Sequence, residues 1–87
     1  MNESLEKTLV LTAHQINYFI VRSNKSTNNR FYGIMAEAIN DETDFGIAEN
    51  LFFTQAEATE YCKWLADNEV YPITLCDVLG NIYHLQI

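Results

Sequence analysis

Apolar and polar positions follow two different periods along this chain. In the first half, apolar residues alternate in short runs typical of β-strands: Thr8–Thr12, Ile16–Arg22, Arg30–Ile39 and Thr43–Leu51. In the second half, apolar residues recur every three or four positions, as in amphipathic helices. This order predicts an α+β domain: a three- or four-stranded antiparallel meander sheet followed by two short helices packed on one face.

The strand predictions carry two alternatives. The run Thr8–Thr12 also fits a single helical turn, and Ala36–Ala38 has helix propensity inside the third run. Asn40–Glu42 has the composition of a tight turn, which predicts an antiparallel hairpin between the third and fourth strands. The longest polar segment, Ser23–Asn29, has neither period and is predicted to be a loop.

The fourth predicted strand has an uneven pattern of side chains. Its larger apolar residues share one parity, which Glu49 interrupts. Gly46 and Ala48 leave the opposite face thin, as expected where another element packs closely or where a bulge interrupts the strand. The residues of shared parity are Phe45, Ile47, Leu51 and Phe53.

The clearest local signal is a helix start at Thr54. Thr54 and Glu57 have the spacing of a capping box, in which the Thr54 hydroxyl accepts from the Glu57 N–H and the Glu57 carboxylate accepts from the Thr54 N–H. Phe53 and Ala58 have the spacing of a hydrophobic staple. We therefore expect a helix from about Gln55 to Asn68.

A second helix is expected to begin at Pro72 or Ile73, because the missing proline N–H costs nothing in the first turn. Its apolar positions keep helical spacing as far as Leu79. Gly80–Asn81 is expected to end it and to leave 82–87 as a short extended tail.

The second predicted strand has apolar side chains on both faces. Ile16, Tyr18 and Ile20 share one face, and Phe19 and Val21 share the other. This predicts an inner strand or a second buried surface. Core packing accounts for most of these residues, but a sheet covered by helices on one side would leave some of this apolar area in water. The candidate interaction surface consists of Phe19, Val21, Tyr32 and Ile34.

Length and charge restrict the class of protein. Its 87 residues suit a single domain, with residues 1–7 expected to be frayed. Residues 1–30 carry four Lys or Arg against two Asp or Glu, whereas residues 31–87 carry one against ten. This acidic half disfavours nucleic-acid binding and suits a basic protein partner. Without an apolar run of about 20 residues or a signal peptide pattern, we expect a cytoplasmic protein with no membrane segment.

No pattern of catalytic or metal-binding residues emerges from the sequence. Cys62 and Cys76 have no metal-type spacing and are interpreted as reduced structural cysteines, with a single disulfide as the alternative. His14 and His84 lack partners at ligand spacing, and Cys76 and His84 would lie two turns apart on a helix. The acidic group at 41–44 is interpreted as a solvated hairpin tip. We expect no catalytic, cofactor-binding or metal-binding residue.

Two short motifs resemble a known family. Tyr32-Gly33-Ile34 lies on a strand, and Val-Tyr-Pro-Ile-Thr-Leu-Cys-Asp-Val follows the capped helix at 70–78. This is similar to a family of short uncharacterised proteins from Gram-positive anaerobic bacteria, with a Tyr-Gly-Ile strand and a closing Val-x-Pro-x-x-Leu-x-Asp-Val helix. The resemblance covers residues 30–83; it implies a helix after Pro72 and no known activity. Where that family has an acidic pair, this chain has Gly80–Asn81, so the resemblance assigns no role to carboxylates there.

These features favour a small acidic interaction module that self-associates, as a homodimer in its simplest form, through the uncovered sheet face or an open edge strand. The alternative is an acidic regulatory protein that binds a basic protein partner. An enzyme with an unrecognised site ranks third, because no catalytic constellation supports it. We therefore expect a protein partner or a second copy, and neither nucleic acid, membrane nor cofactor.

Overall fold

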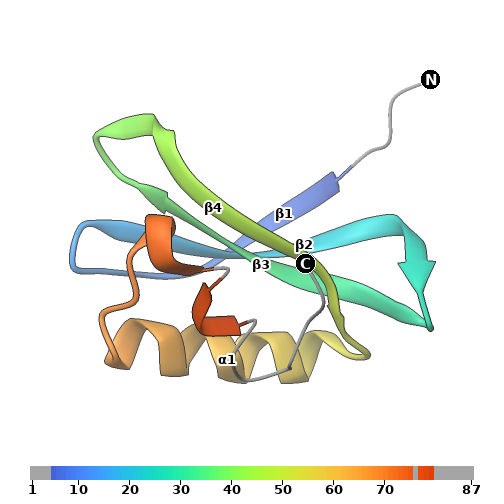
Figure 1. Ribbon diagram of the computed structural model, residues 1–87. Helices are drawn as coiled ribbons and strands as arrows, with labels where there is room; N and C mark the ends of the chain where they lie inside the picture. Colours follow the sequence, from blue (N-terminus) through green and yellow to red (C-terminus); the bar gives the residue numbers. More distant parts are fainter. Residues whose placement is uncertain (1–4, 76, 80–87) are drawn as a thin grey trace.

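The computed structural model describes residues 5–75 and 77–79. Four strands form one antiparallel sheet in the order β1-β2-β3-β4, and the helical elements lie together on one face of it (Figure 1). This confirms the predicted α+β meander sheet with two helices on one face. The elements are β1 (Leu5–Ala13), β2 (Ile16–Thr27), β3 (Arg30–Ala38), β4 (Asp41–Phe52), α1 (Gln55–Asp67) and the 3-10 helix η1 (Pro72–Thr74), which helical residues at 75 and 77–79 follow. The predicted end at Gly80–Asn81 and the tail lie outside the described residues.

The first two hairpins close through two-residue turns in the left-handed region. His14 and Gln15 have φ of 56° and 63°, and Asn28 and Asn29 have φ of 53° and 65°. Two positive φ values in succession match the twist of paired strands, and asparagine adopts this region more readily than most residues. The predicted loop at Ser23–Asn29 is therefore wrong: β2 continues to Thr27, and only the two asparagines form the turn.

The first strand is longer than predicted and contains a bulge. It begins at Leu5 rather than Thr8, and it is a strand rather than a helical turn. The register with β2 shifts between Leu9 and Leu11. Because one extra residue reverses the alternation of side chains, Leu9 is exposed while Leu11 packs against the core.

The third hairpin turns one residue earlier than predicted. The turn is Ile39–Asn40, and β4 already begins at Asp41. The Asp41 carboxylate accepts hydrogen bonds from the hydroxyl and the N–H of Thr43, and these bonds lower the pKa of Asp41. The carboxylate thus shapes the start of the strand, and Ala36–Ala38 is strand rather than helix.

A second bulge lies in β4. Between the pairs Tyr32 with Phe52 and Ile34 with Ala48, β3 has one residue and β4 has three. Asn50 has φ of 58°, and its Nδ2 donates to the Lys25 and Arg30 carbonyls at 2.9 and 2.8 Å. Of the two expectations for Gly46 and Ala48, close packing holds at Gly46, which approaches Pro72, and the bulge lies just beyond Ala48, at 49–51. The shared face predicted for Phe45, Ile47, Leu51 and Phe53 is wrong, because the bulge turns Leu51 into the core while Phe45 and Phe53 stay exposed.

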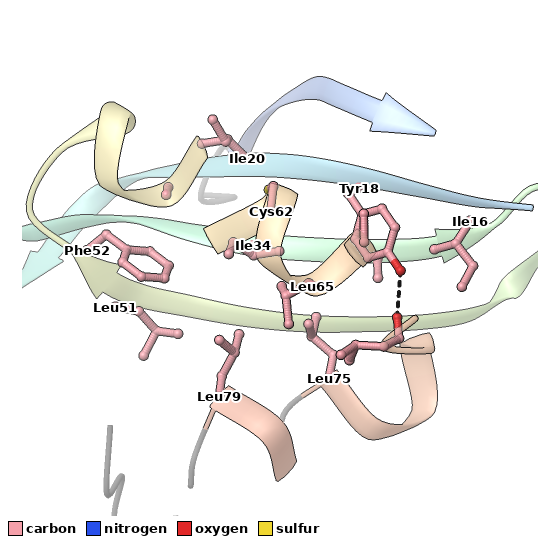
Figure 2. Close-up of a cluster of buried hydrophobic side chains, with 14 residues drawn as sticks. Ile16, Tyr18, Ile20, Ile34, Leu51, Phe52, Cys62, Leu65, Leu75 and Leu79 are labelled. Atoms are coloured by element: carbon pink, nitrogen blue, oxygen red, sulfur yellow. Dashed lines mark hydrogen bonds between the residues drawn. The ribbon is translucent and has the colours of Figure 1, made fainter. Parts of the chain in front are cut away.

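The core lies between the sheet and the helices (Figure 2). The inward residues of β2 contact the buried face of α1 as the periodicity predicts. Leu75 and Leu79 close the same cluster from the second helical segment. The main buried residues are Ile16, Tyr18, Ile20, Ile34, Ala36, Leu51, Phe52, Ala58, Cys62, Leu65, Ala66, Leu75 and Leu79.

The start of α1 follows the sequence prediction in part. The Thr54 hydroxyl accepts from the Glu57 N–H at 3.2 Å, as a capping residue does. The Glu57 carboxylate, however, accepts from the Phe53 N–H at 3.3 Å and not from Thr54. Phe53 is exposed, and the Arg30 guanidinium lies 4.9 Å from its ring centroid, a cation–π contact rather than the predicted staple.

Candidate functional site

The sheet face opposite α1, called the outer face below, has no described helix over it (Figure 1). Directly paired residues share a face in antiparallel sheets. Leu9 pairs with Phe19, Phe19 with Met35, and Met35 with Ile47. These four residues, called the apolar row below, cross all four strands in one line.

The apolar row remains partly open to solvent. Leu9 is 53% exposed, and Phe19, Met35 and Ile47 are half-buried. In the next row along the strands, Phe45 pairs with Glu37 and is 50% exposed. The outer face therefore carries a continuous apolar surface rather than isolated residues, which is the arrangement of a protein contact.

Two charged side chains flank Phe19 on this face. The Lys7 ammonium lies 4.7 Å from the Phe19 ring centroid, a cation–π contact, and 4.0 Å from a carboxylate oxygen of Glu37. Lys7 comes from β1 and Glu37 from β3, so the pair spans β2, which lies between them. The methylene stem of Lys7 covers apolar area while its charged head reaches a partner.

The structure separates the four residues predicted as the interaction surface. Phe19 and Val21 lie on the outer face, as predicted, but Val21 is only 1% exposed. Tyr32 and Ile34 point the other way: Ile34 is 0% exposed within the core, and Tyr32 packs against it. The predicted surface is therefore wrong as a set, because residue 34 has the parity of the helix-covered face.

The residues that complete the outer face are Leu9, Met35, Phe45 and Ile47, and the sequence reasoning did not select them. The feature that identifies them is the cross-strand register, that is, which residues pair between neighbouring strands. It depends on the two bulges and on the turn positions, which periodicity alone places only to within a few residues.

A small hollow lies on the helix side of the sheet. It has a volume of about 60 Å³ and is lined by Glu6, Thr8, Ile20, Arg22, Tyr32 and Gln55. Glu6 and Arg22 are paired residues of β1 and β2, so the lining contributes one carboxylate and one guanidinium. These charges balance and select neither an anion nor a cation.

The single described cysteine is structural. Cys62 is a free, buried thiol 3.8 Å from the Phe19 carbonyl, to which it donates. Burial raises the pKa of Cys62 from 9.0 to about 12, so the thiol stays protonated at neutral pH and is a poor nucleophile. His14 lies in an exposed hairpin turn. Cys76 and His84 lie outside the described residues.

Within 5–75 and 77–79, no three His, Cys, Asp or Glu side chains gather as metal ligands would. In the same part of the chain, no helix has the length and apolar character needed to cross a membrane.

Comparison with known families gives one match, to a family of unknown function, DUF6514, over residues 3–85. The chain belongs to this family. The DUF6514 match covers nearly the whole sequence, so the domain described above is the family's domain. No curated protein and no solved structure matches the chain significantly. That the family occurs in Gram-positive anaerobic bacteria, and that its members share the two motifs, remain predictions from the sequence resemblance.

Proposed function

We propose that this DUF6514 protein is a small interaction module that self-associates through its outer face. The observation that carries the proposal is the apolar row, which runs from Leu9 on β1 to Ile47 on β4 on the face opposite α1. Apolar surface that extends across several strands is stabilised when a partner removes it from water, at about 25 cal/mol per Å².

Charge favours a second copy of the chain as the partner. The whole molecule has a net charge of −7, so two copies repel each other across most of their surfaces. At the centre of the outer face, by contrast, Lys7 and Glu37 balance. Two copies that meet through this face bring together a neutral centre and an apolar row instead of two acidic surfaces.

Other exposed apolar residues support the choice of this face by contrast. They lie at a turn, at the start of α1, on the solvent side of α1, in the connector after it and in η1, and no strand register joins them in a row. These residues are Ile39, Phe53, Trp64, Tyr71 and Ile73.

A matched pair of substitutions tests the proposal. Leu9→Asp adds a charge at a 53% exposed position of the outer face, and Ile73→Asp adds the same charge at an 83% exposed position on the helix side. Sedimentation velocity over micromolar to submillimolar concentrations is expected to show wild-type dimers, at least tenfold weaker association for Leu9→Asp, and no change for Ile73→Asp. A wild type that stays monomeric over this range overturns the proposal.

The second candidate is an acidic regulator that binds a basic protein. The observation in its favour is that every acidic residue from 31 to 87 except Glu37 is exposed. Binding of this kind weakens steeply with salt, whereas an apolar contact does not. A pull-down from the native cell at 50 and 500 mM salt, with mass spectrometry, separates the two: loss of the captured protein at high salt favours the acidic regulator.

The proposed function is binding, without a chemical step. We also propose that the protein acts in the cytoplasm. The acidic surface supports a protein partner over nucleic acid, because phosphate backbones attract the opposite charge. Incubation with labelled single- and double-stranded oligonucleotides at low salt tests this, and binding at micromolar protein would contradict it.

A further inference from the structure

The strand register places Phe19 midway between Lys7 and Glu37. Lys7 pairs with Val21, two residues beyond Phe19 on β2. Glu37 pairs with Asn17, two residues before Phe19. On the outer face, the two charges therefore occupy opposite ends of a diagonal whose centre is Phe19.

A charge pair arranged about a central apolar residue is self-complementary. In a two-fold symmetric contact, if residue i of one copy meets residue j of the other, then j of the first meets i of the second. A two-fold axis that lies in the plane of the contact, over Phe19 and perpendicular to the diagonal, brings each Lys7 opposite the Glu37 of the other copy. The same axis places the two Phe19 rings against each other.

We propose that two copies meet outer face to outer face about this axis, so that Lys7 of each copy pairs with Glu37 of the other around a Phe19–Phe19 centre. This inference rests on the proposed self-association and specifies its geometry. It also gives the two charges a role that their own pairing leaves open, because a pair 4.0 Å apart with a partly exposed lysine contributes little to the stability of one chain.

The Lys7 side chain has the freedom that the geometry requires, whereas Glu37, at 18% exposure, is held in place beside it. Lys7 is 47% exposed, and its ammonium has three donors, so it can keep the Glu37 of its own chain while it reaches the Glu37 of the other. Removing these groups from water on contact strengthens their attraction, provided that both charges stay paired. The pairing therefore fixes the orientation of the two copies more than it adds affinity.

Charge reversal gives a sharp test. Lys7→Glu leaves two negative charges at the centre of the face, and Glu37→Lys leaves two positive charges. Each variant alone is expected to self-associate at least tenfold more weakly than wild type in sedimentation velocity. An equimolar mixture of the two is expected to recover association, with mixed dimers identified by native mass spectrometry.

The double variant Lys7→Glu/Glu37→Lys tests the axis itself. It restores a pair within each chain, so it is expected to self-associate like wild type. It is not expected to pair with wild type, because residue 7 of one copy would then meet a like charge at residue 37 of the other. The same charge reversals at Lys63 and Glu60 of α1, a pair 3.8 Å apart, serve as the control. They are expected to leave the affinity of self-association unchanged.

The outcomes separate this inference from the proposed function. If wild type dimerises and both single reversals dimerise equally well, or if the double variant mixes freely with wild type, the face-to-face geometry is overturned while self-association stands. If wild type is monomeric at all concentrations, both fall. Circular dichroism of each variant confirms that the comparison is between folded chains.

Discussion

The Tyr18 hydroxyl donates a 2.7 Å hydrogen bond to the carbonyl of Val70, 52 residues further along the chain (dashed line in Figure 2). Tyr18 lies near the start of β2 and is fully buried, and Val70 follows the end of α1. A buried carbonyl that loses its donor costs more than the hydrogen bond itself contributes. This bond therefore fixes the end of α1 and the connector against the sheet.

Replacing Tyr18 with Phe is expected to lower the free energy of unfolding by about 1 to 3 kcal/mol, because the aromatic ring still fills the core but the Val70 carbonyl loses its partner. Urea denaturation followed by circular dichroism measures the change. Tyr71→Phe, which alters an exposed tyrosine in the same connector, is the matched control and is expected to have little effect. Equal stability of Tyr18→Phe and wild type would contradict the role given to this bond.

Alkaline pH is expected to destabilise the fold through its two buried acids. Burial raises the pKa of Cys62 from 9.0 to about 12, and burial followed by the nearby Tyr71 raises the pKa of Tyr18 above 10.0. Both groups are neutral when protonated and ionise more readily in the unfolded chain. Their stabilising contribution is therefore complete below about pH 9 and is lost as the pH rises toward 12.

For Cys62 alone, three pKa units correspond to at most about 4 kcal/mol of this loss. Urea denaturation at pH 7, 9 and 10.5 measures the slope. Cys62→Ala is expected to be less stable at pH 7, since it leaves a small void, yet to lose less stability as the pH rises. A slope identical to that of wild type would mean that this thiol is not responsible.

How far the sequence determines this fold can be judged from particular residues. Thr54 and Glu57 predicted the start of α1, and alternation predicted the four strands in order, because both signals depend on residues close in sequence. The prediction of a loop at Ser23–Asn29 is wrong because polar residues in a strand leave no apolar alternation in the sequence.

The candidate site was harder to predict for the same reason. Phe19 was placed on the outer face from its own strand, but its neighbours Met35 and Ile47 belong to strands whose register is fixed by bulges. A bulge moves every following side chain to the other face of the sheet. An error of one residue in the predicted register therefore assigns a side chain to the wrong face. Ile34 pairs directly with the buried Ile20, so its face follows from the register of β2 with β3, which the alternation within β3 alone does not give.

The cap of α1 offers a local test. Thr54→Ala removes the acceptor of the Glu57 N–H and is expected to lower the free energy of unfolding by about 1 kcal/mol. Thr59→Ala makes the same change five residues later, where the hydroxyl donates to the Gln55 carbonyl, and is expected to be neutral or slightly stabilising because alanine favours helix interiors. Thermal melts compare the two; equal effects would argue against the cap.

Gly46 brings the backbone of β4 close to the second helical segment. A Cβ at this position would lie 2.1 Å from the Pro72 carbonyl oxygen, a backbone atom that cannot move without displacing η1. Gly46→Ala is therefore expected to destabilise the protein by about 1 to 3 kcal/mol. It is also expected to speed proteolysis within 70–79. Limited proteolysis with mass spectrometry checks the site of cleavage, and an unchanged pattern would contradict the close packing.

Glu69 ends α1 in a conformation that suits glycine. Its φ is 52°, its N–H donates to the Ala66 carbonyl at 3.1 Å, and the Val70 N–H donates to the Leu65 carbonyl at 3.0 Å. These two bonds, with a left-handed residue after the cap, form a Schellman motif.

Glu69→Gly is therefore expected to raise the free energy of unfolding by up to about 1 kcal/mol, because glycine adopts positive φ without the steric cost that a Cβ brings. Glu69→Ala removes the same carboxylate but keeps the Cβ, so it is the matched control and is expected to stay close to wild type. Urea denaturation of the three chains separates the backbone effect from the charge effect. If both variants gain equally, relief of acidic repulsion is the cause and the strain at residue 69 is not.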